Sequence, residues 1–115
     1  MKILHLTVTK QWFDLMVNGT KRIEYREMKV YWNERLTKKD KWYDINDPER
    51  YIKFDEIHIK NGYQKNAPFF RVAHLKTDST PPKLIMHNEG TMLHLKTSCY
   101  QLHLGKILEI KNYNL

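Results

Sequence analysis

The order of the expected elements limits this chain most strongly, because helices are predicted only near its start and strands fill the remainder. Apolar residues three and four positions apart predict a short helix between residues 9 and 18 and a second helix over 28–38. Alternating apolar and polar residues predict strands at 3–8, 21–26, 54–60, 69–76, 83–86, 92–97 and 100–111. The helices lie early and strands dominate later, so we expect an α+β fold with a small barrel or curled sheet rather than alternating βαβ units.

Turn-forming residues set the expected boundaries between these elements. Thr9 can cap the first helix, and Asn18-Gly19 supplies a left-handed stop at its end. Asn61-Gly62 ends the strand at 54–60, and the polar, proline-containing segment 77–82 is expected to separate two strands. The remaining expected connections are loops at 40–53 and 63–68 and turns at 88–90 and near 98–99.

Three sets of residues share a predicted face. The first two sets lie on the predicted helices, and their tryptophans, Trp12 and Trp32, are expected in the core. The sets are Trp12, Leu15 and Met16; Met28, Trp32, Arg35 and Leu36; and, on the last strand, Leu102, Leu104, Leu108 and Ile110.

Length and composition predict one domain over residues 1–115, and we expect a monomer. No apolar run approaches the roughly 20 residues of a membrane-spanning helix, and no signal-peptide core follows Met1. The single cysteine, Cys99, cannot form an internal disulfide, which is typical of a reducing compartment. We therefore expect a cytoplasmic protein in which Cys99 is inert.

The charge balance favours a polyanionic partner such as nucleic acid. Twenty Lys and Arg residues against thirteen Asp and Glu residues give a net charge of +7. The surplus is concentrated after residue 56, where eight basic residues accompany three acidic ones. Scattered surface lysines that only maintain solubility are the alternative explanation.

The densest group of polar side chains lies between Gly19 and Glu27. Alternation places Glu24 and Arg26 on one strand face, with Lys21 nearby, and a carboxylate between cations stays ionised. Arg35 is expected to join them from the second helix, with Glu24 as its partner. This group could bind the polar edge of a ligand, or it could be a structural salt-bridge network that closes the barrel.

The segment Gly19-Thr-Lys-Arg-Ile-Glu-Tyr-Arg26 has the pattern Gly-x-Lys-x-x-Glu-x-Arg, and other segments accompany it in order. They are Ile3-Leu-His-Leu-Thr, Trp12-Phe13, Tyr31-Trp-Asn-Glu-Arg-Leu36 and Phe54-Asp-Glu-Ile-His-Ile-Lys-Asn-Gly-Tyr63. Together they resemble the ASCH family over about the first 63 residues. The resemblance implies a PUA-like small β-barrel with flanking short helices.

The resemblance also implies a cleft that binds RNA or a nucleotide, lined by Lys21, Glu24 and Arg26. We add residues whose chemistry suits such a ligand: Lys29 for phosphate, Tyr63 or Tyr31 for stacking on a base, and Glu24 for a base amino group. The expected RNA- or nucleotide-binding residues are Lys21, Glu24, Arg26, Lys29, Arg35, Asn61 and Tyr63.

Two alternatives to simple binding stay open. Some ASCH relatives resemble amidohydrolases that deacetylate modified cytidine with a lysine and a threonine nucleophile, but Glu24 stands at that threonine position here. A hydrolase or ribonuclease would instead use Lys21 and Glu24 as an acid and base pair. The other alternative is a protein-interaction module. The histidine spacings predict no metal site, and we expect no cofactor.

Overall fold

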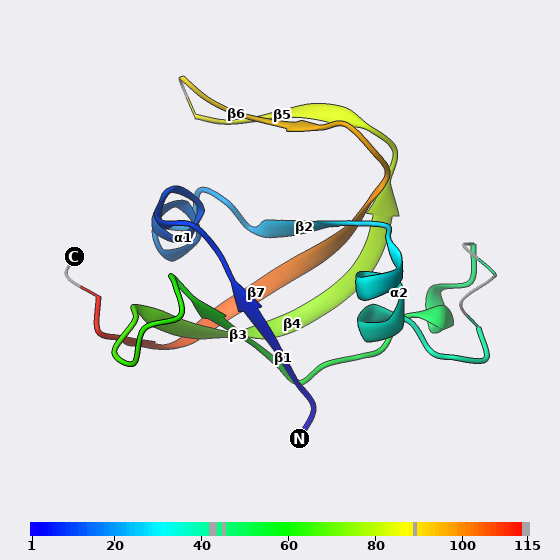
Figure 1. Ribbon diagram of the computed structural model, residues 1–115, viewed down its shortest axis with the longest axis horizontal. Helices are drawn as coiled ribbons and strands as arrows, with labels where there is room; N and C mark the ends of the chain where they lie inside the picture. The colour runs from blue at the N-terminus through cyan, green and yellow to red at the C-terminus, as the bar shows by residue number, and fades with distance from the viewer. Residues whose placement is uncertain (42–43, 45, 89, 114–115) are drawn as a thin grey trace. The chain divides into compact units, whose positions relative to one another are not determined.

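The computed structural model describes residues 1–41, 44, 46–88 and 90–113, and Figure 1 traces their path. The elements in chain order are β1 (Ile3–Thr7), α1 (Lys10–Val17), β2 (Ile23–Glu27), α2 (Val30–Leu36), the 3₁₀ turn η1 (Pro48–Arg50), β3 (Glu56–Lys60), β4 (Phe69–Thr80), β5 (Lys83–Asn88), β6 (Thr91–Leu95) and β7 (Cys99–Lys111). Two short helices accompany a sheet, so the predicted α+β class is confirmed. No helix in the described ranges is long and apolar enough to cross a bilayer.

Five strands form one mixed sheet in the order β1-β3-β4-β7-β2. β1 runs parallel to β3, with Leu4 opposite Ile57, and β3 runs antiparallel to β4, with Ile57 opposite Val72. β5 and β6 pair separately as an antiparallel hairpin. Among the described strands, β1 and β2 are the two edges of the sheet, so the expected small barrel takes the form of an open half-barrel.

The chain divides into two compact units, and each unit combines segments that are distant in sequence. The first unit contains Met1–Ile23, Phe54–Leu75 and His103–Leu115, and the second contains Glu24–Lys53 and Lys76–Leu102. The long strands β4 and β7 therefore contribute residues to both units.

The core of the first unit follows the period-two alternation of its strands. β1, β3 and β4 each direct every second residue inward, and α1 covers these residues with its own apolar side chains. Phe13 is fully buried, and its ring lies 5.0 Å from that of Phe70 in an edge-on contact. The buried apolar residues of this unit are Leu4, Leu6, Val8, Phe13, Leu15, Met16, Phe54, Ile57, Ile59, Ala67, Phe70, Val72 and Leu104.

The core of the second unit is organised around Tyr100 near the start of β7. The Tyr100 hydroxyl donates a hydrogen bond to Oδ1 of Asn33 on α2, so this buried phenol keeps a polar partner. The buried Arg50 guanidinium lies over the rings of Tyr51 and Tyr100, 4.9 and 5.8 Å from their centroids. These contacts attach the segment around η1 to β7 and α2.

The predicted ends of several elements are wrong. β4 continues to Thr80 through the segment 77–80 that we expected to be a break, because threonine favours extended backbone and the two prolines come only after it. β2 begins at Ile23 rather than at residue 21. α2 spans only Val30–Leu36 instead of 28–38. Parts of the predicted loop 40–53 and turn 88–90 (residues 42, 43, 45 and 89) lie outside the described residues.

Several predicted faces also need correction. Trp12 is half-buried, because the edge-on contact of Phe13 with Phe70 places Phe13 in the core instead. Trp32 is likewise half-buried. On β7, where four residues were predicted to share one face, Leu102 and Leu104 are buried, whereas Leu108 and Ile110 are 41% and 37% exposed. The Leu104 amide donates to the carbonyl of Arg22, which immediately precedes β2.

The boundaries of α1 are close to the prediction. Thr9 occupies the N-cap position in extended backbone, although its side chain makes no capping hydrogen bond. Asn18 is the C-cap residue, and Gly19 has a φ of 86°, which glycine adopts without the steric cost of a side chain. The predicted stop at Asn18-Gly19 is therefore confirmed.

Candidate functional site

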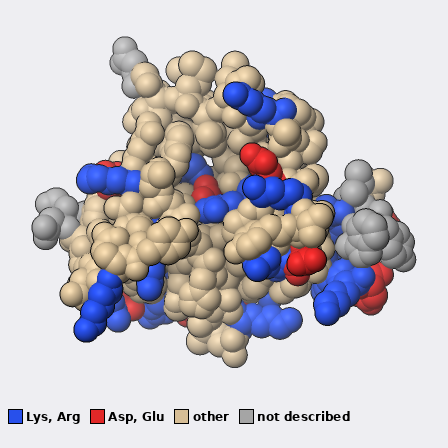
Figure 2. Space-filling view, viewed as in Figure 1, with Lys and Arg blue, Asp and Glu red and all other residues tan. Residues whose placement is uncertain are grey.

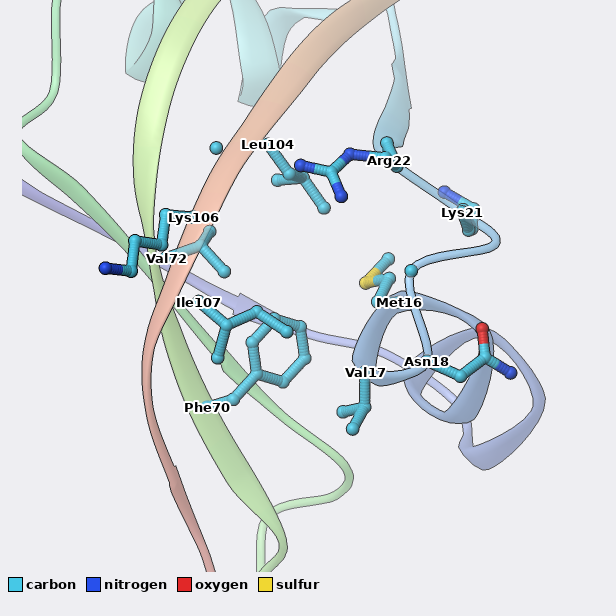
Figure 3. Close-up of a pocket in the computed structure, with 12 residues that line it drawn as sticks. Met16, Val17, Asn18, Lys21, Arg22, Phe70, Val72, Leu104, Lys106 and Ile107 are labelled. Atoms are coloured by element: carbon cyan, nitrogen blue, oxygen red, sulfur yellow. The ribbon is translucent and has the colours of Figure 1, made fainter.

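A pocket of about 450 Å³ lies in the first unit between α1 and strands β4 and β7 (Figure 3). This volume falls within the range of about 300–1,000 Å³ that is typical of small-molecule sites. Its lining residues are Met16, Val17, Asn18, Gly19, Lys21, Arg22, Phe70, Val72, Leu104, Gly105, Lys106 and Ile107.

One rim of the pocket is the short connection from α1 to β2, and backbone hydrogen bonds fix its course. The Gly19 amide donates to the Met16 carbonyl over 3.2 Å, and the Lys21 amide donates to the Leu15 carbonyl over 2.9 Å. At the other end, the Leu104 amide donates to the Arg22 carbonyl over 2.9 Å. The connection is thus held against both α1 and β7, which fixes where the side chain of Arg22 starts.

The floor of the pocket is apolar. Figure 3 shows Met16 and Val17 of α1 directed toward Phe70 of β4 and Ile107 of β7. Phe70 is fully buried, so only the edge of the core reaches this surface. A floor of this kind favours a flat or apolar part of a ligand.

The Arg22 side chain is an exposed cation of this pocket whose charged end lies over it. In Figure 3 its guanidinium extends from the connection toward Leu104 and β7. Arg22 is exposed, and its side chain makes no hydrogen bond or ion pair within the described part of the chain. None of the described residues that line the pocket is acidic. Lys106 contributes its stem to the lining, but its ammonium points away from the pocket in the same view.

Lys21 lies deeper than Arg22. Only 1% of it is exposed, and its Nζ donates a hydrogen bond to the Ile23 carbonyl. The same Nζ lies 6.0 Å from the centroid of the Trp12 ring. The Lys21 side chain therefore supports the pocket from behind its surface.

Glu24 and Arg26 form an ion pair in the second unit. Arg26 Nη2 lies 2.7 Å from Glu24 Oε2, and the two side chains are 19% and 9% exposed. The Tyr25 amide donates to Glu24 Oε1 over 3.1 Å, and the Arg26 guanidinium lies 4.9 Å from the centroid of the Trp32 ring. The two side chains share a strand face as predicted, and they bind each other.

Arg35 does not pair with Glu24, which corrects that prediction. Its Nη1 donates to the Tyr31 carbonyl over 2.8 Å, and its guanidinium stacks 3.4 Å from the centroid of the Tyr31 ring. Arg35 is exposed rather than covered by apolar neighbours, because Leu36 and not Arg35 faces the core. Lys29 is the exposed N-cap residue of α2.

Asn61 and Tyr63 belong to the turn after β3. The Asn61 side chain donates to the Val8 carbonyl over 3.1 Å, so it fastens the turn to the end of β1. Tyr63 is 91% exposed at the rim of another, smaller hollow. Of the seven predicted ligand-binding residues, Lys21 is the one that lines the pocket beside α1.

Arg22 was missed as a site residue, although its position in the sequence offered a signal. It follows a glycine stop and precedes the first apolar residue of the next strand, so it belongs to a connection rather than to an alternating strand. Binding residues are frequent in connections that a rigid scaffold holds in place.

The histidines and the cysteine are spread over several strands of the structure. No three metal-ligating side chains cluster among the described residues. His74 is buried and accepts a hydrogen bond from the Phe54 amide, while the other histidines lie on strands and are partly or fully exposed. Cys99 is buried, and burial raises the pKa of its thiol, with the charge of Glu27 acting in the same direction.

Comparison with known protein families, with curated proteins and with solved structures found no match to this chain. Lys and Arg side chains outnumber Asp and Glu side chains on the face shown in Figure 2, in keeping with the net charge of +7.

Proposed function

We propose that this protein binds RNA or a nucleotide in the pocket beside α1. One observation carries the proposal: an exposed arginine without a partner in the described chain stands beside an apolar floor, and none of the described lining residues is acidic. A base or sugar would lie on the floor between the half-buried Val17 and Ile107, and a phosphate would meet Arg22.

The two halves of a nucleotide match the two parts of this pocket. A guanidinium binds phosphate oxygens with paired N–H donors, and it is more weakly hydrated than an ammonium group. The apolar floor supplies contact area for a base, whose flat face is itself weakly hydrated. Because the volume is about 450 Å³, the pocket suits one nucleotide or the end of an RNA chain.

The resemblance to the ASCH family points to the same place. Its most specific element begins at Gly19, and Gly19 and Lys21 both line the pocket. The PUA-like barrel and RNA-binding cleft that the resemblance implies agree with an α+β half-barrel that has a basic pocket. The position of Arg22 adds a phosphate-binding group to this pattern.

The arrangement favours binding over hydrolysis. A general base in the hydrolase alternative would be Glu24, but its two oxygens accept hydrogen bonds from the Arg26 side chain and the Tyr25 amide. The other member of the acid and base pair, Lys21, donates to a backbone carbonyl. Both groups are therefore engaged in the fold.

The proposal is tested by titrating the full chain with a fluorescent single-stranded RNA and with a mononucleotide. We expect Arg22→Gln to weaken binding by about tenfold, which corresponds to about 1.4 kcal/mol for one lost charged contact. The variant should also reduce the slope of log K against log salt by about 0.7 for RNA, because one phosphate contact is lost.

Lys38→Gln is the matched control, because Lys38 is an exposed lysine outside the pocket. It removes the same unit of charge and should leave the affinity within about twofold. Equal losses for both variants would show that general charge attraction, rather than the pocket, holds the RNA. Unchanged binding by Arg22→Gln would contradict the proposal.

A further inference from the structure

A second hollow of about 230 Å³ lies in the first unit, where the neighbouring strands β1 and β3 end. It is lined by residues of both strands and of the turn that follows β3. These residues are His5, Leu6, Thr7, His58, Lys60, Gly62 and Tyr63.

The strand register gathers basic side chains at this hollow. β1 and β3 are parallel, with His5 opposite His58 and Thr7 opposite Lys60. Their alternate residues fill the core, so His5, His58 and Lys60 share the other face of the sheet. The two imidazole rings meet edge-on, with their centroids 5.3 Å apart.

One acidic residue stands near these groups, and its charge is already matched. Glu56 Oε1 lies 2.9 Å from His58 Nε2, and Arg71 Nη1 donates to Oε1 and Oε2 of Glu56 over 3.1 and 3.0 Å. Arg71 also donates through Nε to Glu109 over 3.1 Å. Glu56 therefore orients His58, and it does not line the hollow.

Three nitrogen groups remain available to a ligand. The side chains of His5 and Lys60 make no hydrogen bond or ion pair in the described ranges, and the same holds for Nδ1 of His58. A protonated His58 donates from both ring nitrogens, so it can bridge Glu56 and a bound anion. None of the lining residues in the described part of the chain is acidic.

The turn at Asn61-Gly62 shapes the open side of the hollow. Gly62 has a φ of 102°, which glycine adopts without the strain that a side chain would introduce into the turn. The turn carries Tyr63, which is 91% exposed at the rim. A large aromatic ring in this position offers a surface on which a planar group can stack.

We propose that this hollow is a phosphate-binding site formed by His5, His58 and Lys60. Its volume of about 230 Å³ is below the range of about 300–1,000 Å³ for whole small molecules, so it suits a single phosphate group. The phosphate can be free or belong to a nucleotide, whose base would then stack on Tyr63. The site is separate from the pocket beside α1, and the two share no lining residue.

NMR spectra of the histidine rings of the full chain test this site. We expect inorganic phosphate to shift the ring signals of His5 and His58 in a saturable way, while those of His94 and His103 stay in place. A 5′-mononucleotide and its unphosphorylated nucleoside then separate the two sources. The nucleotide should bind more tightly than inorganic phosphate if Tyr63 stacks, and the nucleoside alone should not produce the shifts.

Lys60→Gln should weaken phosphate binding by about tenfold, because a charged hydrogen bond to the phosphate is lost and tenfold corresponds to about 1.4 kcal/mol. Lys65→Gln, an exposed lysine of the following loop, is the matched control and should not change the affinity. Arg22→Gln should also leave the histidine shifts unchanged, which separates this site from the proposed function. An absence of saturable shifts, or equal shifts at His94, would overturn the proposal.

Discussion

Arg22 and Arg26 stand four residues apart, yet their side chains have opposite surroundings. Arg22 is exposed beside an apolar pocket and has no partner within the described residues. Arg26 is 19% exposed, pairs with Glu24 and covers the ring of Trp32. The difference arises from backbone context, because Arg22 precedes β2 while Arg26 lies inside it, on the same strand face as Glu24.

This difference separates two roles that look alike in the sequence. A guanidinium that is largely buried needs a carboxylate or an aromatic face, and it then contributes to stability rather than to binding. An exposed guanidinium without a carboxylate partner contributes little to stability and can bind an incoming anion. Residues 19–26 therefore contain both alternatives that the sequence leaves open. Arg22 belongs to the proposed ligand site, and Arg26 belongs to the structural network.

The largest effect should come from breaking the structural pair. Arg26→Gln should lower the free energy of unfolding by about 1.5–3 kcal/mol, because it removes a charged hydrogen bond from the nearly buried Glu24. Arg22→Gln should change the same free energy by no more than about 0.5 kcal/mol. Urea unfolding of the two variants and the unchanged protein measures both values.

A double-mutant cycle sharpens this comparison. The cycle with Glu24→Gln, Arg26→Gln and the double variant should give a coupling energy of about 1 kcal/mol or more, because the two side chains interact directly. Equal losses of stability for Arg22→Gln and Arg26→Gln would contradict the assignment of different roles to the two arginines.

The next effect concerns the connection that carries Arg22. Gly19→Ala should cost about 1–2 kcal/mol of stability, because a φ of 86° is strained for a residue with a side chain, and nothing within 4 Å would add a clash. The variant should also weaken nucleotide binding, since the rest of the connection would shift. Thermal unfolding and the binding titration check the two results.

Gly19→Asn is the matched control, because asparagine tolerates the left-handed region better than alanine. It should keep more of the stability and more of the affinity. If alanine and asparagine were equally well tolerated, the conformation of Gly19 would not be what positions the pocket rim.

The sequence predicts this fold well where one local pattern decides the structure. Alternation around Ile57 and Ile59 identifies β3 and its buried face, and Asn18-Gly19 identifies the end of α1. The sequence-based prediction is wrong where tertiary contacts determine which residue is buried. The contact with Phe70, for example, places Phe13 rather than Trp12 in the core. The polar composition of 77–80 also led to a wrong prediction of a break between strands, because these residues continue β4.

The candidate site is less predictable than the fold. The sequence identifies Lys21 and the stacking candidate Tyr63, but spacing cannot show that they line different hollows. It also joins Glu24 with Arg35, although Arg35 stacks on Tyr31 instead. Partners of long, flexible side chains depend on distances through space, and one-dimensional spacing does not contain them.

The smallest effect should come from the ion pair between Glu56 and a third arginine, Arg71. This pair is more exposed than the pair of Arg26 with Glu24. The hydrogen bond from His58 holds the pKa of Glu56 below its ordinary value of 4.5, and the hydrogen bonds and charge of Arg71 act in the same direction. A carboxyl with a lowered pKa in the folded state stabilises the fold above its unfolded-state pKa. This stabilisation is lost as the pH falls through the folded-state value.

Glu56→Gln should therefore lower the melting temperature slightly at about pH 7, and the difference from the unchanged protein should shrink at about pH 3. Glu34→Gln, which replaces an exposed carboxylate without a partner in the described chain, should give a small difference that does not vary with pH. A Glu56→Gln difference that stayed constant down to acidic pH would mean that the carboxylate is not favoured by His58 and Arg71. In that case the orientation of His58 toward the phosphate hollow would have to come from packing against His5 and Phe69 alone.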